Sequence, residues 1–201
     1  MKKLLILCVA VLLAASLSSF LPSGSDFELY DNVIRLHVIA NSDSEEDQAM
    51  KLRVRDRILE FIGERLEGAE TKADAEIKMT ELLPEIESAA AEVISEGGCG
   101  FSVTATLSPE TYPRKSYGTV TLPAGEYTSL RVVIGGGEGQ NWWCVLFPRM
   151  CTHPAVSAEE QEEEFIDAGF TPSQYKIITG SEDTRYVVKF RIVELFKSIF
   201  K

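Results

Sequence analysis

Two long stretches with the periodicity of amphipathic helices follow one another closely, and they limit what this chain can fold into more than any other feature. From residue 44 to about 66, apolar side chains recur at helical spacing between basic ones. A second apolar stripe runs from about 71 to 96, where two glycines end it. Pro84 lies inside this second stretch and should kink or split the helix. Each helix needs an apolar surface to cover, which the rest of the chain must provide.

Residues 33–39 provide the first part of that surface. Apolar and polar residues alternate there and β-branched residues are frequent, which predicts a strand with one buried face. The turn formers Asn41-Ser42-Asp43-Ser44 come next, and either Ser44 or Asp43 should cap the first helix. Three acidic residues after them suit the positive end of the helix dipole.

Three further strands are predicted after the second helix, over residues 101–107, 117–122 and 130–134. They are short and separated by turn residues, which favours an antiparallel meander over a parallel sheet. Residues 157–169 indicate an acidic helix, and 185–201 a helix or a strand followed by a helix. The predicted fold class is therefore α+β: an antiparallel sheet of about four strands packed with two long amphipathic helices, plus C-terminal helices.

The first 24 residues have the three-part layout of a secretory signal. Lys2 and Lys3 precede an apolar run over residues 4–17, and small residues follow at Ser18 and Ser19. The alternative is an uncleaved membrane anchor over residues 1–20, although a helix over 4–19 spans only about 24 Å of the roughly 30 Å of hydrocarbon. We expect a signal peptide and linker over residues 1–24 and a single folded domain over 25–201.

The net charge of −11 argues against nucleic acid as a partner, because an acidic surface repels phosphates. The glycine-rich run 135–139 has no Lys-Ser or Lys-Thr after it, so we expect neither a phosphate-binding loop nor a small-molecule cofactor. These glycines are better suited to a flexible turn that lets residues 141–148 move into place. Trp142 and Trp143 follow this turn. In a strand they point to opposite faces, so one is expected in the core and the other exposed as an interface anchor.

Three cysteines lie beyond the predicted signal, at Cys99, Cys144 and Cys151. Outside the cytosol the close pair Cys144 and Cys151 is a disulfide candidate, because closing a loop of about eight residues removes denatured-state entropy worth about 2.5 kcal/mol. Free buried thiols are the alternative. We expect no metal site, because the cysteine spacing is too long for a structural zinc site and His153 adds only a third ligand.

The sequence contains no self-supporting catalytic set. A serine hydrolase would need His37 or His153 as its base, but the chain has no Gly-x-Ser-x-Gly elbow. A cysteine peptidase that pairs Cys144 or Cys151 with His37 stays open on sequence alone. His37 is more simply interpreted as a partly buried residue with a hydrogen-bonded ring. We therefore expect a protein that is not an enzyme, with a secreted thiol-dependent or cell-wall hydrolase as the alternative.

Two stretches of the chain resemble signature motifs of the stage II sporulation protein R family. The first is IRLHVIANSDS at residues 34–44, continuing into EDQ at 46–48 and KLRVRD at 51–56. The second is NWWCVLFP at residues 141–148, ending at Cys151. The resemblance covers about residues 33–151. The family pattern usually has a small or apolar residue after Pro148, so Arg149 in this chain is expected to alter local contacts with a partner.

The resemblance implies a messenger that is made in the forespore and secreted into the space between the forespore and mother-cell membranes. There it would activate a membrane-embedded aspartic protease of the mother cell, similar to stage II sporulation protein GA, which then removes the pro-sequence of a sigma factor. Such a messenger needs a docking surface. We expect that surface, or its scaffold, at Arg35, His37, Asn41, Asp43, Trp142 and Trp143. For Asn41 and Asp43, the alternative is a purely structural role at the start of the helix.

Overall fold

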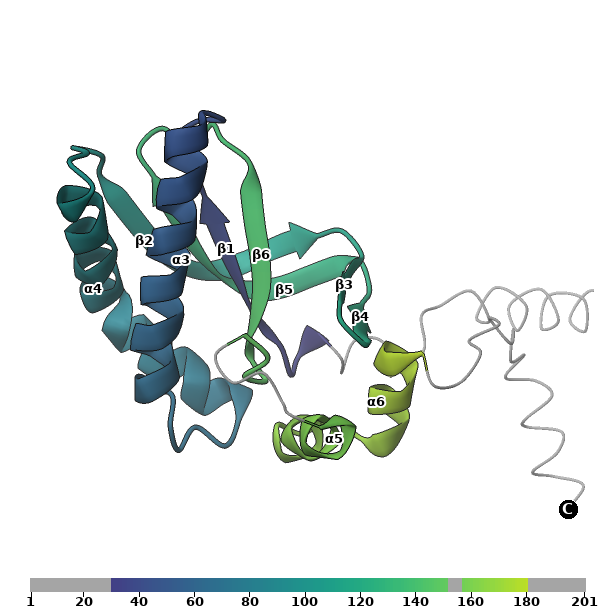
Figure 1. The fold of residues 1–201 in the computed structure, drawn as a ribbon. Helices are drawn as coiled ribbons and strands as arrows, with labels where there is room; N and C mark the ends of the chain where they lie inside the picture. Colours follow the sequence, from purple (N-terminus) through teal and green to yellow (C-terminus); the bar gives the residue numbers. More distant parts are fainter. Residues whose placement is uncertain (1–29, 152–156, 181–201) are drawn as a thin grey trace, which may run out of the picture.

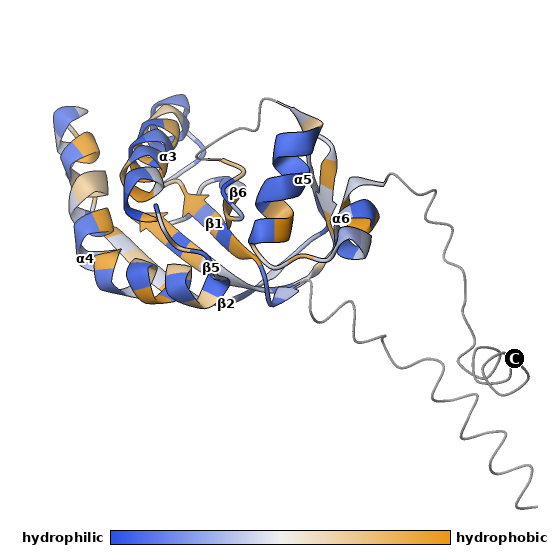
Figure 2. Ribbon diagram, turned by 90° about the horizontal axis from the view of Figure 1, so that it is seen from below, coloured by the Kyte–Doolittle hydropathy of each residue, from blue (hydrophilic) through white to orange (hydrophobic). Residues whose placement is uncertain are grey.

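A four-stranded sheet with two long helices packed against it forms the centre of the computed structural model, which describes residues 30–151 and 157–180 (Figure 1). The predicted signal over 1–24, the C-terminal stretch 185–201 and His153 lie outside the described residues. Figure 2 shows that the helices around the sheet mix hydrophobic and hydrophilic positions, as expected of amphipathic helices that bury one side.

The first predicted long helix is confirmed as α3, which spans Glu45–Arg65. Its N-cap is Ser44, whose side-chain oxygen accepts a hydrogen bond from the Asp47 N–H at 3.2 Å. This bond satisfies one of the backbone donors that an α-helix leaves unpaired at its start. Asp43 is therefore not the cap, and its carboxylate is used elsewhere.

The second predicted long helix is confirmed as α4, which spans Lys72–Glu96 and starts with a capping box between Thr71 and Asp74. Pro84 lies inside α4, and the helix is continuous across it, so of the two predicted alternatives, a kink or a split, the split does not occur. The ribbon of α4 changes direction part-way along in Figures 1 and 2, as expected of a helix that contains a proline. The bend lets one helix pack on α3 and also reach β2.

The sheet confirms the predicted α+β class. Its strands lie in the order β2-β5-β1-β6, with these bounds: β1, Ile34–Ile39; β2, Val103–Tyr112; β5, Gly125–Ile134; β6, Asn141–Phe147. β2 pairs antiparallel with β5, and β6 pairs antiparallel with β1. The central pair β1 and β5 is parallel, so the sheet is mostly but not wholly antiparallel.

The predicted meander is wrong in its middle strand. Residues 115–122 form a separate hairpin of β3 (Lys115–Tyr117) and β4 (Val120–Leu122), in which Gly118 turns the chain with a φ of 58°. β2 continues past its predicted end at Leu107 and pairs with β5 along its whole length. The two long strands therefore meet directly and leave no position between them for the hairpin.

The prediction of one buried face on the first strand is also wrong, because all six residues of β1 are buried. Its central place in the sheet gives it a neighbour on each side. One face meets α3, and the other carries Arg35 and His37 beneath the aromatic rings of Tyr112, Tyr117 and Trp143. Polar residues at alternate positions usually face water, and here they face an aromatic layer instead.

The acidic C-terminal helix is confirmed as α5, which spans Ala158–Asp167 after an N-cap at Ser157. α6, over Pro172–Thr179, was not predicted. Its signals are present in the sequence, because Thr171 caps it, proline occupies its first turn and Gly180 follows its end with a φ of 64°. Phe165, Phe170 and Tyr175 pack the two helices together, with ring centroids 5.0–5.5 Å from Phe165.

Candidate functional site

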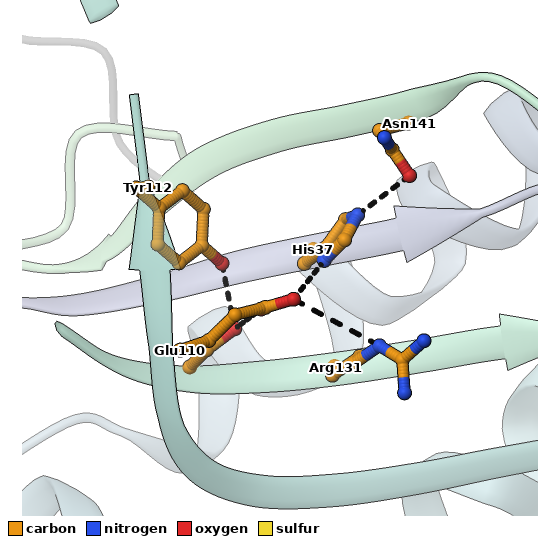
Figure 3. Close-up of polar contacts among 6 residues, drawn as sticks. His37, Glu110, Tyr112, Arg131 and Asn141 are labelled. Carbon is orange, nitrogen blue, oxygen red and sulfur yellow. Dashed lines mark hydrogen bonds and ion pairs between the residues drawn. The ribbon is translucent and has the colours of Figure 1, made fainter. Parts of the chain in front are cut away.

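The register of four strands brings a polar cluster together on the sheet face that points away from α3 and α4. His37 on β1 lies opposite Arg131 on β5 and Trp143 on β6. Glu110 reaches the same cluster from β2, and Asn141 from the start of β6 (Figure 3). Residues far apart in the sequence thus meet around one imidazole ring.

Both ring nitrogens of His37 are engaged. Nδ1 lies 2.8 Å from Glu110 Oε1, and Nε2 lies 2.8 Å from Asn141 Oδ1 (Figure 3). Because both partner atoms are oxygens, a protonated ring donates to both and forms an ion pair with Glu110. The ring is buried and has no free nitrogen with which to act as a general base, so the geometry favours a structural role.

Glu110 connects His37 to a further pair of hydroxyl groups. Its Oε2 accepts a hydrogen bond from Ser129 Oγ at 2.8 Å, and Ser129 Oγ lies 2.6 Å from the Tyr112 hydroxyl. Arg131 Nε lies 3.9 Å from Oε1. Burial alone would raise the pKa of Glu110, but the hydrogen bonds from Ser129 and His37 and the charge of His37 together hold this pKa below its ordinary value.

Arg35 is fully buried in a cage of three tyrosines. Its guanidinium carbon lies 3.8 Å from the centre of the Tyr112 ring, 5.0 Å from that of Tyr127 and 5.6 Å from that of Tyr117. Nη2 donates a hydrogen bond to the Tyr117 hydroxyl, whereas Nε and Nη1 have no partner among the described residues. Burial raises the pKa of all three tyrosines, so their hydroxyl groups stay neutral beside the cation. Arg35 thus belongs to the scaffold and not to the surface.

Asn41 and Asp43 fasten the glycine-rich turn to the start of α3. Asn41 Oδ1 accepts a hydrogen bond from the Gly136 N–H at 2.9 Å, and Asp43 Oδ1 accepts one from the Gln140 N–H at 2.8 Å. Asn41 also donates to Asp47 Oδ2 at 2.8 Å. The turn is therefore pinned, and the expectation that it is flexible is wrong.

Two further contacts hold the same turn. The buried Lys51 on α3 donates from Nζ to the Gln140 carbonyl at 2.9 Å. The backbone of Gly139 lies so close to Ser42 that a Cβ on Gly139 would stand 2.2 Å from the Ser42 carbonyl oxygen. Glycine is needed here for close approach of two backbones, a different reason from the flexibility that its abundance suggested.

The two tryptophans point to opposite faces of β6, as predicted, but both are half-buried and neither is a core or a fully exposed residue. Trp142 lies on the helix side, where the guanidinium carbon of Arg55 is 4.9 Å from its ring centre. Trp143 lies on the polar side, 5.8 Å from the His37 ring and 5.6 Å from Lys115 Nζ. Each tryptophan therefore carries a cation on its ring and keeps part of its surface exposed.

Cys144 and Cys151 are placed as a disulfide pair, with Cα atoms 6.5 Å apart. This separation lies within the range that disulfides span. Cys99 is a free, partly buried cysteine. Neither Cys144 nor Cys151 is among the hydrogen-bond partners of His37, so the geometry does not assemble the cysteine peptidase pair that the sequence left open.

Within residues 30–151 and 157–180, no three metal-ligating side chains gather at one point. In the same part of the chain, none of the helices has the length and apolar character needed to cross a bilayer. Arg149 lies at a cleft of about 710 Å³ between α5 and the segment after β6, with its Nε 4.0 Å from Glu164 Oε1.

The comparisons with known proteins agree with the two motifs that this geometry joins. The sequence model of the family described as Stage II sporulation protein R matches residues 30–157. The chain is also 31% identical to Stage II sporulation protein R of Bacillus subtilis (strain 168) over 223 aligned residues, which cover 100% of both chains. No solved structure matches.

The chain belongs to the stage II sporulation protein R family. The matched region contains β1 to β6 with α3 and α4, and it ends where the N-cap of α5 begins. Of the six residues expected at the docking surface or its scaffold, Arg35 and His37 are buried in the sheet, and Asn41 and Asp43 hold the glycine-rich turn. Only Trp142 and Trp143 combine a place in a family motif with partly exposed aromatic surface.

Glu110 and Ser129 were missed by sequence reasoning. Carboxylates are abundant in this chain, and neither residue stands in a motif that marks it as special. Glu110 reaches His37, and Ser129 reaches Glu110, only through the pairing of β2 with β5 and of β5 with β1. The one local signal is Pro109, which breaks the alternation just before Glu110 and hides the continuation of β2.

We expect Gly139→Ala to lower the free energy of unfolding by about 1–3 kcal/mol, because the new Cβ meets backbone that has no room to move. Gly136→Ala is the matched control, because a Cβ there makes an ordinary contact of 3.6 Å with the Glu138 side chain. Urea unfolding followed by tryptophan fluorescence measures both variants. Equal stabilities for the two variants would show that the turn is not held as described.

Glu110→Gln should change how stability depends on pH. The folded-state pKa of Glu110 is lowered, so its carboxylate stabilises the fold above the unfolded-state pKa near 4.5 and stops doing so as the pH falls through the folded-state pKa. At pH 7 the variant should be less stable by about 1–3 kcal/mol, and this difference should shrink between about pH 5 and pH 3.

The control for this measurement is Glu126→Gln, an exposed carboxylate on β5 without an ion pair among the described residues. Its stability should stay within about 0.5 kcal/mol of the parent protein at pH 7. Unfolding by urea at a series of pH values compares the three proteins. A difference between parent and Glu110→Gln that is the same at pH 7 and pH 3 contradicts the assignment.

Proposed function

We propose that this protein is an exported signalling protein of sporulation that activates a membrane-embedded aspartic protease of the mother cell, which then processes a pro-sigma factor. The observation that carries the proposal is the similarity to Stage II sporulation protein R over the whole length of both chains. The family model adds support, because it spans both motifs and the strands that connect them.

The geometry of the polar cluster supports a role without catalysis. Both nitrogens of His37 are occupied, Glu110 is committed to His37 and Ser129, and Cys144 lies beside Cys151. A general base or a nucleophile needs a free atom that faces a substrate. The thiol-dependent hydrolase has no such arrangement among the described residues, so we keep the messenger role alone.

The signal would act by binding. Contact with the extracytoplasmic part of the protease would stabilise its active arrangement, by no more than the difference in affinity for the active and inactive states. Trp142 and Trp143 are the proposed contact residues, because half-buried aromatic rings on a fixed strand lose little entropy when they bind. The residues that would hold that strand in place are Arg35, His37, Asn41 and Asp43.

The route to the partner would begin at the N-terminus. Residues 1–24 would direct export from the forespore into the space between the two membranes, with retention of residues 1–20 as an anchor as the alternative. Nucleic acid would not be a partner, because the strong net negative charge of the chain repels phosphates. Neither a metal nor a small-molecule cofactor enters the proposal.

Co-expression of the chain with the candidate protease and its pro-sigma substrate tests the proposal. Shortening of the substrate on a gel should require both the chain and the protease. Trp143→Ala should reduce the rate of shortening by about tenfold or more, because a central aromatic contact is lost. Ile77→Ala is the control, since Ile77 is 61% exposed on α4 and lies outside both motifs. If the stable, exported chain leaves the substrate intact, the proposal is wrong.

The disulfide is a separate prediction about the exported protein. We propose that Cys144 and Cys151 are oxidised after export, whereas Cys99 stays free. The double variant Cys144→Ser, Cys151→Ser should lose about 2.5 kcal/mol of unfolding free energy, because the denatured chain is no longer cross-linked. Cys99→Ser is the matched control. Mass spectrometry of the non-reduced protein without residues 1–24, after alkylation, should find one modified thiol, and three modified thiols would disprove the pairing.

A further inference from the structure

The two edges of the sheet differ in how well they are protected from pairing with a further strand. On β2 the residues that face β5 include Ser102, whose carbonyl accepts the Gly135 N–H at 2.8 Å just before the strand starts. Alternation along the strand then directs the N–H groups of the odd-numbered residues outward. The Ala105 N–H is capped by Glu87 of α4 at 2.7 Å, and Pro109 has no N–H at all. This edge is covered by a helix residue and interrupted by proline, two devices that prevent strand pairing.

The opposite edge belongs to β6, which has a neighbouring strand on one side only (Figure 1). The Val145 N–H points to Cys151 Sγ at 3.4 Å, away from the ladder with β1. The backbone N–H and C=O of Gln140 are taken by Asp43 and Lys51. Backbone groups alternate in direction along a strand, so between Gln140 and Val145 the N–H and C=O groups of Asn141 and Trp143 point outward. On this side β6 has no neighbouring strand among the described residues, so these four groups face no strand partner.

The composition of β6 makes this edge suited to strand pairing. Its sequence, NWWCVLF, contains no charged residue and no proline, so it lacks the usual protection of an exposed edge. The neighbouring contacts fix its position, through the pinned turn at its start and the Cys144–Cys151 pair at its end. Because this unprotected edge is rigid, it loses little conformational entropy when an extended segment forms hydrogen bonds with it.

Cations lie on both faces of the sheet near β6, on a chain that is acidic overall. Lys115 Nζ lies 5.6 Å from the Trp143 ring and forms no ion pair within the described residues. Arg131, on the same sheet face, keeps a side chain that is 46% exposed and has Glu110 as an ion-pair partner at 3.9 Å. On the other face, Arg55 stacks on Trp142 and also forms an ion pair with Asp56 at 2.5 Å. A segment that pairs with β6 therefore passes between cations, which favours acidic side chains.

We propose that the free edge of β6 binds an extended, acidic segment of the partner protein as an additional strand. The proposal rests on the proposed function, because the partner is the protease that the chain activates. Backbone hydrogen bonds from Asn141 and Trp143 hold the segment, Trp142 and Trp143 contact its side chains on the two faces, and Lys115 selects its charge. The occupant is a segment of the partner and not a second copy of this chain.

A proline scan of the two edges tests the pairing. Asn141→Pro removes an outward N–H without touching the ladder to β1, and it should reduce substrate shortening in the co-expression assay by about tenfold or more. Asn141→Ala is the matched control, since it loses the same contact to His37 but keeps the N–H. Thr111→Pro places proline at an outward position of β2 and should leave shortening unchanged. Equal activity of Asn141→Pro and Asn141→Ala overturns the proposal, provided that the parent chain activates the protease; loss of activity in the parent counts against the proposed function instead.

Two measurements keep the test decisive if Asn141→Pro fails to fold, as judged by its thermal unfolding. Lys115→Glu alters an exposed side chain and should weaken binding of the full chain to the detergent-solubilised protease by about tenfold, and more at low salt than at high salt. Hydrogen exchange of the bound chain should slow at the Asn141 and Trp143 amides and leave Trp142 and Cys144 unchanged. Unchanged affinity for Lys115→Glu together with unchanged exchange at both outward amides overturns the proposal. Light scattering that finds a dimer of the chain alone, with those amides already protected, assigns the edge to a second copy and also overturns it.

Discussion

Burial of two polar side chains on one central strand is the constraint on which the rest of this structure depends. Arg35 and His37 lie in the middle of the sheet, where an unpartnered polar group is costly. Residues from other strands meet part of this cost: three tyrosines surround the Arg35 guanidinium, one of which accepts its hydrogen bond, and Glu110 and Asn141 contact the two ring nitrogens of His37. These partners come from β2, the β3–β4 hairpin, β5 and β6, so the same contacts that satisfy β1 also fix the order of the sheet.

The elements that the sequence predicted well are those whose signals are local. Both long helices follow from their apolar stripes, and their starts follow from Ser44 and Thr71, each within one turn of the residue it caps. α6 has equally local signals and was available to the same reasoning. The sheet was harder, because β1 pairs in parallel with β5, a strand that follows α3, α4 and three other strands in the chain. No residue within either strand encodes that choice.

The candidate site shows the same division. The two family motifs were visible in the sequence, but what they do in the fold was not. Asn41 and Asp43 were expected at a surface or at a helix cap, and they bind backbone N–H groups of residues almost a hundred positions later. Such a contact depends on the connection between β5 and β6 returning beside β1. Glu110 had no motif at all, and only strand register brings it to His37.

The contacts between the two family motifs explain why the position of β6 depends on buried residues elsewhere in the fold. β6 begins at a turn held by Asn41, Asp43 and Lys51, and it pairs along its length with the strand that carries Arg35 and His37. Loss of any of these contacts lets β6 shift, and the positions of Trp142 and Trp143 shift with it. If the proposed function is correct, a change at Asn41 would therefore weaken partner binding without a direct contact between Asn41 and the partner. A loss of activity alone does not distinguish contact residues from scaffold residues here. Substitution of a contact residue reduces binding and leaves stability unchanged, whereas substitution of a scaffold residue reduces binding and stability together.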